Sequence, residues 1–544
     1  MSIGICDILI FMKKIFLIFL LFTCQFLLVT AKASAISEFS TNFNSLYIIS
    51  ASGKANITHT IILKNNLAQV YAKDYALTTT GDNIKNITIS DENGPINYTV
   101  NTKKGVTIIS IKITNPAIGK DKEKILTINY ETDAIAEIIG PTITINIPRL
   151  ARSNEATSYT RVVKIEGVTN LPSIIYPKPS NFALEGDFAV YTFAGHQNDS
   201  LSFLFGQSVT YKLNLNYELR NKQLTAIESE FALPPDTAYQ HIVIDNITPP
   251  PQNIFLDNDG NWLARYKLNS QTKLNIKASL YATVYPNPTL YDPSKNIIKN
   301  NLKNKYWDSN SSMIADLSTR LKNPENIYNY IKDNFTYNYN GINSSESRKG
   351  ALVALTIPTN VLCTEFTDAF VALARSANIE SREINGYGFT KNSLLQPQNV
   401  TTDILHAWPE YFDESKKAWI SVDPTWGNTT GGIDYFHKLD FSHIAFVRHG
   451  EEDSYPLPAG AYKTNSTVKS IDIQVAQSDP QENTSSEIKN DIFYNTGNVA
   501  IQNDTVGYVP PYGSVKLLSH KPLSLYDKIK NICAKLFSKF YPQQ

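Results

Sequence analysis

Three side chains of the types used in nucleophilic catalysis occur in the second half of the chain: Cys363, His406 and Asp423. A cysteine thiolate can attack a carbonyl carbon, an imidazole can carry the proton, and a carboxylate can fix the tautomer and orientation of that imidazole. These groups suffice for acyl transfer through a thioester. Each alone is more often a structural residue, so the hypothesis depends on all three occurring together.

A predicted β-hairpin brings the histidine and the aspartate together. The hairpin is expected over residues 404–423, with its turn centred at 414–415. This register places His406 directly opposite Asp423, with Cβ atoms about 4.5–5.5 Å apart. Pro409 cannot donate to the ladder, and a bulge there would shift the register by one residue.

Cys363 stands at the start of a predicted helix, because Phe366, Phe370 and Leu373 recur behind it at helical spacing. Unpaired N–H groups and the dipole at a helix N-terminus favour a thiolate, and a nearby histidine would lower the pKa of the thiol further. Helical patterns precede this stretch, one of them expected to open with Asn323 as N-cap and Pro324 as first residue, and strand patterns follow it. Residues 300–465 are therefore predicted to form an α+β domain.

Several motifs around the three residues agree in order and spacing with one known family. Residues 324–449 resemble the transglutaminase-like superfamily, the papain-related group that contains transglutaminases and bacterial thiol peptidases. The resemblance covers about a quarter of the chain. The matching segments are IYNYIKDNFTY at 327–337, RKGA at 348–351, CTEFTDAFVALARSANIESR at 363–382, HAWPE at 406–410 and WISVDPT at 419–425.

This resemblance implies a role for each of the three residues. Cys363 corresponds to the nucleophile, His406 to the base and Asp423 to the orienting acid. Two positions depart from the family pattern. Pro409 stands where a β-branched residue is more usual, and Asn378 stands where glycine is common. Neither departure touches the triad.

The resemblance also implies an oxyanion hole and a substrate cleft. The backbone N–H of Cys363 is one expected donor to the oxyanion. Family members often add an aromatic donor from upstream, for which Tyr337 and Tyr339 are the candidates. Trp408 and Trp426 are expected either as walls of the cleft or as part of the core.

The sequence predicts no metal, no cofactor and no nucleic-acid partner. His437, His443 and His449 lack the spacing of a zincin motif and are interpreted as structural. The four cysteines form neither a disulfide framework nor a zinc-ribbon pattern. The chain has 50 Lys and Arg against 50 Asp and Glu, whereas proteins that bind nucleic acid usually carry a basic excess.

The segment before the α+β domain is rich in β patterns. Alternating and β-branched runs, bounded by Asn, Gly, Asp and Pro, predict two β-sandwich-like modules at 36–165 and 166–290. A single large sandwich is the alternative. No residue pattern indicates which ligand these modules bind. A cell-surface polymer is the candidate partner.

The first 35 residues have the pattern of a signal peptide. A basic start at Met12–Lys14 precedes the apolar run Ile15–Val29, and Ala33–Ala35 supplies a cleavage site. The pattern predicts export, with a mature chain that begins at Ile36 and a secreted or cell-surface location outside the cytoplasm. A retained membrane anchor is the alternative.

The C-terminal part is predicted to be a polar linker with a small β module at 466–520, followed by a basic amphipathic helical tail at 521–544. The apolar face of the tail requires a partner. Either the chain's own β module or an anionic membrane surface could cover it.

The sequence as a whole predicts a multi-domain protein, with all-β modules, a transglutaminase-like α+β domain and a small C-terminal β module. The expected function is that of a secreted cysteine enzyme that forms a thioester with a peptide or amide substrate, then hydrolyses or cross-links it. The alternative is a non-catalytic surface protein that uses the same domains for binding.

Overall fold

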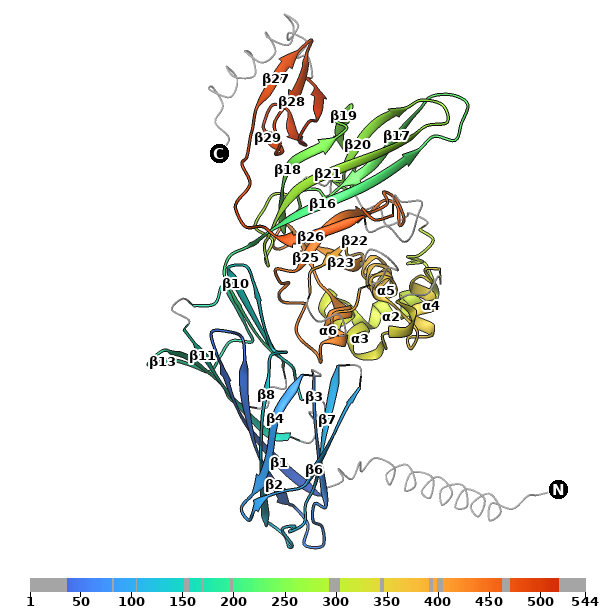
Figure 1. Cartoon of the computed structure of the whole chain (residues 1–544). Helices are drawn as coiled ribbons and strands as arrows, with labels where there is room; N and C mark the ends of the chain where they lie inside the picture. Colours follow the sequence, from blue (N-terminus) through green and yellow to red (C-terminus); the bar gives the residue numbers. More distant parts are fainter. Residues whose placement is uncertain are drawn as a thin grey trace, which may run out of the picture.

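The computed structural model describes residues 37–80, 83–103, 105–150, 156–167, 171–195, 199–292, 304–342, 347–390, 395–398, 405–461 and 470–517. The predicted signal peptide and the predicted C-terminal tail lie outside these residues, as do Cys6, Cys24 and Cys533. The described chain is mostly β, with its helices concentrated in one region (Figure 1). None of the described helices is long and apolar enough to span a membrane.

The first body is built from three sheets around one hydrophobic core. Its strands alternate buried and less buried residues, as in β2, whose alternate side chains pack inward. An eight-stranded sheet has the order β13-β14-β11-β1-β2-β8-β4-β5, and smaller sheets have the orders β12-β15-β10-β9 and β3-β7-β6. The strands are β1 (Phe39–Ile49), β2 (Ala55–Asn65), β3 (Asp74–Thr80), β4 (Ile84–Asp91), β5 (Gly94–Pro95), β6 (Tyr98–Lys103), β7 (Val106–Lys112), β8 (Glu123–Thr132), β9 (Ala136–Ile139), β10 (Thr142–Ile147), β11 (Ala156–Glu166), β12 (Ile174–Tyr176), β13 (Asn181–Glu185), β14 (Phe188–Phe193) and β15 (Leu201–Phe205).

The predicted division at residue 165 falls inside this first body. Strand β11 pairs in parallel with β1 and antiparallel with β14, so the large sheet continues across that position. Strand β15 likewise pairs with β10. Local alternation did not reveal this, because β-branched strands look alike whichever neighbour they pair with.

The second body consists of two sheets with the orders β18-β21-β16-β26 and β17-β20-β19. Strand β26 comes from beyond the helical region and pairs with β16, with Tyr211 opposite Val475. The chain therefore leaves this body, forms the helical region and returns to it, as Figure 1 shows. The strands are β16 (Val209–Arg220), β17 (Ile227–Leu233), β18 (Gln240–Thr248), β19 (Asn253–Leu256), β20 (Trp262–Leu268), β21 (Lys273–Val284) and β26 (Ile471–Val475).

The helical region combines five α-helices with a sheet of order β24-β23-β22-β25. Asn323 caps the helix that begins at Pro324, as the sequence predicts, because its side chain accepts the N–H of Asn326 at 2.8 Å. The elements are α2 (Ser312–Leu321), α3 (Pro324–Asn334), α4 (Ala351–Thr356), α5 (Cys363–Ser376), α6 (Pro424–Thr429), β22 (Ser381–Gly388), β23 (His406–Asp413), β24 (Ala418–Ser421) and β25 (His443–His449).

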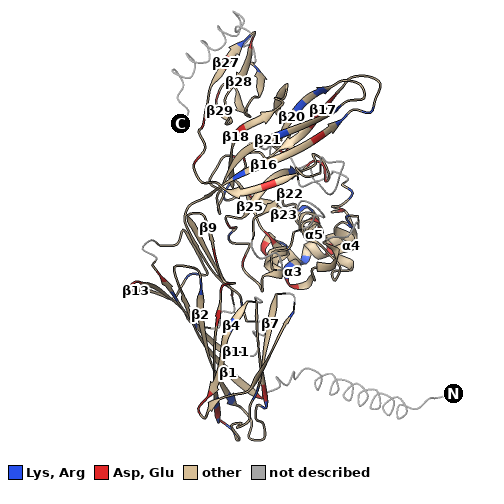
Figure 2. Cartoon of the chain, viewed as in Figure 1, with Lys and Arg blue, Asp and Glu red and all other residues tan. Residues whose placement is uncertain are grey.

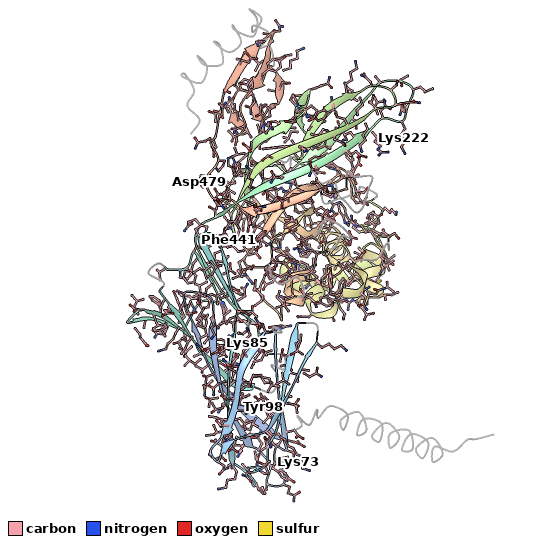
Figure 3. The ribbon with its side chains drawn as sticks, viewed as in Figure 1. Lys73, Lys85, Tyr98, Lys222, Phe441 and Asp479 are labelled. Atoms are coloured by element: carbon pink, nitrogen blue, oxygen red, sulfur yellow. The ribbon has the colours of Figure 1, made fainter. Side chains whose placement is uncertain are left out.

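The second body and the helical region share one hydrophobic core. Phe441 and Ile444 from the helical region pack with Tyr211 and other residues of β16 and β21. The hydroxyl of Tyr211 donates to the carbonyl of Phe441 at 2.9 Å, at the junction where Figure 3 labels Phe441. Gln240 adds two hydrogen bonds to the backbone of Ala445. The second body thus fixes the segment that leads into β25.

The described C-terminal part forms two small sheets that pack on the second body. Gly513 pairs with Ile254 of β19, and the hydroxyl of Tyr508 donates to Asp236 at 2.9 Å. Lys and Arg are interspersed with Asp and Glu along the described chain (Figure 2). The strands are β27 (Ser486–Lys489), β28 (Ile492–Asn495), β29 (Ile501–Asn503), β30 (Gly507–Val509) and β31 (Ser514–Lys516).

Candidate active site

Cys363 is the first residue of α5, as the sequence predicts, and it is buried. The helix start is fixed by Glu365, whose carboxylate accepts the N–H groups of Leu362 and Lys349, each at 2.9 Å. Phe366 and most of α5 are buried behind it, so the cysteine is held by a rigid, well-packed helix.

The thiol of Cys363 differs from the expected thiolate. Burial raises the pKa of Cys363, and the backbone hydrogen bonds from Ala407 and Thr364 that would lower it are too weak to offset burial. The resting group is therefore a thiol. The bond from Ala407 also shows where the cysteine lies, since Ala407 directly follows His406 in β23.

His406 and Asp423 form a buried pair, with His406 Nε2 2.8 Å from Asp423 Oδ2. Asp423 is the N-cap of α6, and its Oδ1 accepts the N–H groups of Thr425 and Trp426 at 2.9 and 3.0 Å. The aspartate is thus held by the helix it caps. The structure brings all three predicted residues into one buried region.

The predicted register of the hairpin was wrong. Glu410 pairs with Ser421, so His406 has no directly opposite partner in β24, which ends at Ser421. The turn lies one residue later than expected, because Asp413 accepts the N–H groups of Ser415 and Lys416. A pairing shift of two residues preserves the face of each side chain, so His406 still meets Asp423.

The imidazole of His406 lies between two indole rings. Its centroid is 4.8 Å from that of Trp426, with the planes 11° apart, and 5.7 Å from that of Trp408. With Nε2 bound to Asp423, its Nδ1 is buried and has no hydrogen-bond partner among the described residues. Stacking fixes the ring plane, so the free nitrogen has a defined direction.

Residues 309–424 match the family model of the transglutaminase-like superfamily. This region is a transglutaminase-like domain. The match contains Cys363, His406 and Asp423, and it supports a cysteine-dependent enzyme in broad terms. No curated protein matches the chain.

Three solved structures are among those similar to parts of this chain. One is a "putative cysteine protease" from Cytophaga hutchinsonii, with 18% identity over 50% of this chain and 87% of that chain, and a TM-score of 0.31. Another is the periplasmic domain of TgpA from Pseudomonas aeruginosa, with 13% identity, 42% and 92% coverage, and a TM-score of 0.23. The third is an M1 zinc metallopeptidase from Deinococcus radiodurans, with 9% identity, 35% and 46% coverage, and a TM-score of 0.22. The assignment rests on the family match alone.

His443, interpreted as structural from its spacing, lies beside the triad in the structure. Its Nε2 lies 3.3 Å from Asp423 Oδ2, and its Nδ1 lies 2.7 Å from Asp440 Oδ1. The other two histidines stay outside the triad. His437 pairs with Asp434, and His449 pairs with Glu383. No single-sequence pattern separates the three, because the contact of His443 depends on how β25 packs beside α6.

The aromatic residues predicted to line the cleft divide into two kinds. Tyr337 is buried near Cys363. Within the part of the chain that the structure describes, neither the Tyr337 hydroxyl nor Trp408 Nε1 has a hydrogen-bond partner. Trp426 instead donates to the carbonyl of Pro397 at 3.3 Å. Tyr339 is half-buried and packs edge-on against Tyr337. The structure thus offers Tyr337 and Trp408 as free donors close to the triad.

One group of the described residues gathers enough ligand atoms to consider a metal ion. The ligand atoms of His406, Asp423 and His443 lie within 4.8 Å of one another. Their contacts are already explained by hydrogen bonds between the histidines and the carboxylate. His406 also keeps its free nitrogen on the other side of the ring, which suits proton transfer better than chelation.

Proposed function

We propose that the chain is a cysteine-dependent acyl-transfer enzyme, with Cys363 as nucleophile, His406 as general base and Asp423 as the acid that orients the imidazole. The observation that carries this proposal is the state of His406. Its Nε2 is bound to Asp423, while Nδ1 is buried and unpaired beside the residue that contacts the thiol. Such a nitrogen is costly to bury unless a reacting group supplies its partner.

The reaction follows from the positions of these groups. His406 Nδ1 takes the proton of the Cys363 thiol as the sulfur attacks the carbonyl carbon of a peptide or amide. The oxyanion that forms accepts hydrogen bonds from the backbone N–H of Cys363 and from the Tyr337 hydroxyl. The imidazolium then protonates the leaving amine, and a thioester remains. Water releases an acid from this thioester, and a second amine releases a cross-linked product.

The proposal also assigns roles to the segments outside the transglutaminase-like domain. The apolar leader at 1–35 favours export, so the substrate would be a peptide or protein outside the cytoplasm. The β-modules would hold the transglutaminase-like domain at a distance from the cell surface or bind a surface polymer. The basic tail at 521–544 would cover its apolar face on a β-module or on an anionic membrane.

A labelling experiment tests the nucleophile. A peptide with an electrophilic carbonyl, which the sulfur attacks as His406 takes the thiol proton, should label Cys363 faster than Cys533 of the same chain, and His406→Gln should slow the reaction of Cys363 alone. Cys363→Ala should abolish turnover of a peptide mixture followed by mass spectrometry. Repeating the incubation with and without an added amine separates hydrolysis from cross-linking. Equal, slow labelling of both cysteines would contradict the proposal.

One observation favours the alternative of a non-catalytic binding protein. Cys363, His406 and Asp423 are each at most 1% exposed, and burial keeps the cysteine as a thiol. A protein that only binds partners through this fold would show the same closed core. It would also tolerate Cys363→Ala without any loss of partner binding, whereas an enzyme would lose all turnover.

A further inference from the structure

His443 has a carboxylate at each ring nitrogen. Nδ1 faces Asp440 at 2.7 Å and Nε2 faces Asp423 at 3.3 Å, and all three side chains are buried. An ionised carboxylate only accepts hydrogen bonds, so both nitrogens must carry a hydrogen. The geometry therefore makes His443 an imidazolium. Burial alone would lower the pKa of His443, but the two aspartates overcome burial and raise it to about 9.

The carboxylate of Asp423 accepts hydrogen bonds from four donors. Two are the backbone N–H groups of Thr425 and Trp426 on Oδ1, and two are the imidazoles of His406 and His443 on Oδ2. Burial opposes the charge of Asp423, yet the two histidines hold its pKa well below the usual range. The carboxylate therefore stays ionised and cannot rotate without breaking several hydrogen bonds.

His406 lies close to this cation, with the ring centroids of His406 and His443 5.7 Å apart. A second positive charge at that distance in a buried site is unfavourable. Burial lowers the pKa of His406, Asp423 raises it and His443 lowers it again, and the net shift is downward. His406 is therefore neutral near pH 7, with its hydrogen on Nε2 and its Nδ1 free.

We propose that His443 is a positioning residue of the catalytic centre. Held as a cation between Asp440 and Asp423, it fixes the Asp423 carboxylate and keeps His406 neutral, so that Nδ1 can accept the proton of Cys363. The resting pair is then a thiol and an imidazole, and charge separates only when a substrate carbonyl is attacked. This role rests on the proposed function, but its electrostatic part can be measured without substrate.

The titratable groups that face the two histidines come from several elements. Asp440 contributes most to the charge of His443 and is anchored through the neighbouring Phe441 by the hydroxyl of Tyr211. Burial lowers the pKa of Lys438 to about 8, and its ammonium lies 4.7 Å from the centre of the Tyr435 ring. Among the described residues, the charged groups that act on the two imidazoles are Asp423 before α6, Asp440 before β25 and the other histidine, and the Tyr435 ring lies 6.1 Å from that of His443.

Nitrogen NMR of the full-length protein with labelled histidine tests the two charge states directly. At pH 7.5, both ring nitrogens of His443 should have shifts of a protonated ring, and His406 should show a neutral ring with the hydrogen on Nε2. Assignments come from His443→Gln and His406→Gln. A neutral His443 or a protonated His406 at this pH would overturn the proposal, whatever the substrate proves to be.

A variant tests the coupling between the histidines. In a Cys363→Ala background, His443→Gln should raise the pKa of His406 by about one unit or more, because a nearby like charge is removed. His449→Gln removes a buried histidine from the same strand and should leave that pKa unchanged. A shift below about 0.3 unit in His443→Gln would contradict the inference.

A kinetic readout separates this inference from the proposed function. With Cys363 intact, His443→Gln should move the acid limb of the kcat/KM profile to higher pH by the same amount, because catalysis needs neutral His406. If no substrate is turned over, or Cys363→Ala retains activity, the proposed function fails while the NMR result still decides the charge state. An unshifted acid limb in an active variant would overturn the positioning role.

Discussion

Two buried polar clusters lie along helix α5, and they differ in how their polar atoms are paired. One, which we call the catalytic cluster after the proposed function, comprises Cys363, His406, Asp423 and His443. The arginine cluster comprises Arg348, Asp368, Glu383 and His449. Both combine histidine and carboxylate groups that are almost fully buried. They therefore allow the features of a reaction site to be separated from those of a structural network.

The arginine cluster pairs its polar atoms with one another. Arg348 bonds both Asp368 and Glu383, and Trp307 donates its indole N–H to Asp368 at 2.8 Å. Glu383 also contacts His449 Nδ1 at 3.2 Å. A buried network of this kind fixes one packing arrangement, provided that every member is satisfied.

In the described ranges, the catalytic cluster leaves polar atoms without hydrogen-bond partners. They belong to Tyr337, His406, Trp408 and Thr425, all in or beside the site. Unpaired buried groups cost about 1–3 kcal/mol each, so a gathering of them calls for a ligand that pairs with them. Unpaired buried atoms also occur elsewhere among the described residues, as at Trp262, Trp419 and Arg448, so the two clusters differ in that several such atoms gather around the triad while the arginine cluster pairs its own.

The largest expected effect is on the catalytic cluster itself. Asp423→Asn should lower kcat by about 10⁴-fold, because an amide no longer favours the tautomer of His406 that leaves Nδ1 free. Steady-state kinetics on a turned-over peptide measures the loss, with circular dichroism to verify folding. A folded variant that retained a tenth or more of the activity would show that the aspartate is not the orienting acid.

The arginine cluster should respond in stability instead. Arg348→Met leaves Asp368 and Glu383 buried without their cation, which should cost about 3–5 kcal/mol of unfolding free energy. Denaturant unfolding measures the change, and kcat of the remaining folded protein should stay close to that of the parent. A large fall in kcat without loss of stability would erase the distinction between the clusters.

Tyr337→Phe probes an unpaired atom directly. We expect kcat to fall about 10²- to 10³-fold through loss of an oxyanion donor, while stability is unchanged or slightly increased. Tyr328→Phe is the matched control, because the Tyr328 hydroxyl accepts the N–H of Tyr435 at 3.1 Å. That variant should show the opposite pattern, with reduced stability and kcat largely retained.

The smallest effect concerns the pH dependence of stability. The pKa of His443 is about 9 in the folded protein and about 6.5 in the unfolded chain. Its stabilising contribution to the free energy of unfolding is therefore fully present below pH 6.5 and is lost as pH rises towards 9. The stability gap between parent and His443→Gln should therefore narrow by about 2 kcal/mol between pH 6.5 and 8. Thermal unfolding at several pH values measures it, and a constant gap would mean that His443 is neutral.

His59 in the first body is a control, because its pKa shift has the opposite sign. Burial lowers the pKa of His59 to about 4, and its ring is bonded to Ser45 and Tyr130. The fold thus favours neutral His59, so its unfavourable contribution disappears as pH rises from about 4 to 6.5. The difference in unfolding free energy between the parent and His59→Gln should accordingly change only between about pH 4 and about pH 6.5.

Local signals in the sequence were enough to locate the helix that carries the nucleophile. The apolar spacing behind Cys363 and the Asn323 cap depend only on neighbouring residues, and both were confirmed. The three catalytic candidates were found by their flanking motifs. The face of His406 was also correct, although the register was not, because a shift of two residues leaves alternation unchanged.

Features that depend on distant contacts could not be predicted. The thiol state of Cys363 depended on burial by the whole domain, and the contact of His443 with Asp423 depended on packing of β25 beside α6. Neither has a signal in the neighbouring sequence, because each is decided by residues far away in the chain. The turn position differs, because it depends on local hydrogen bonds of Asp413 with Ser415 and Lys416.

The return of strand β26 to the second body has a consequence for the order of events during synthesis. Strand β16 leaves the ribosome long before β26, and its pairing edge near Tyr211 must wait for Val475 while the entire transglutaminase-like domain is made. Pairing over such a distance along the chain is slow, and an open strand edge invites contact with other chains. Export in an unfolded state would postpone this wait until both strands are present together.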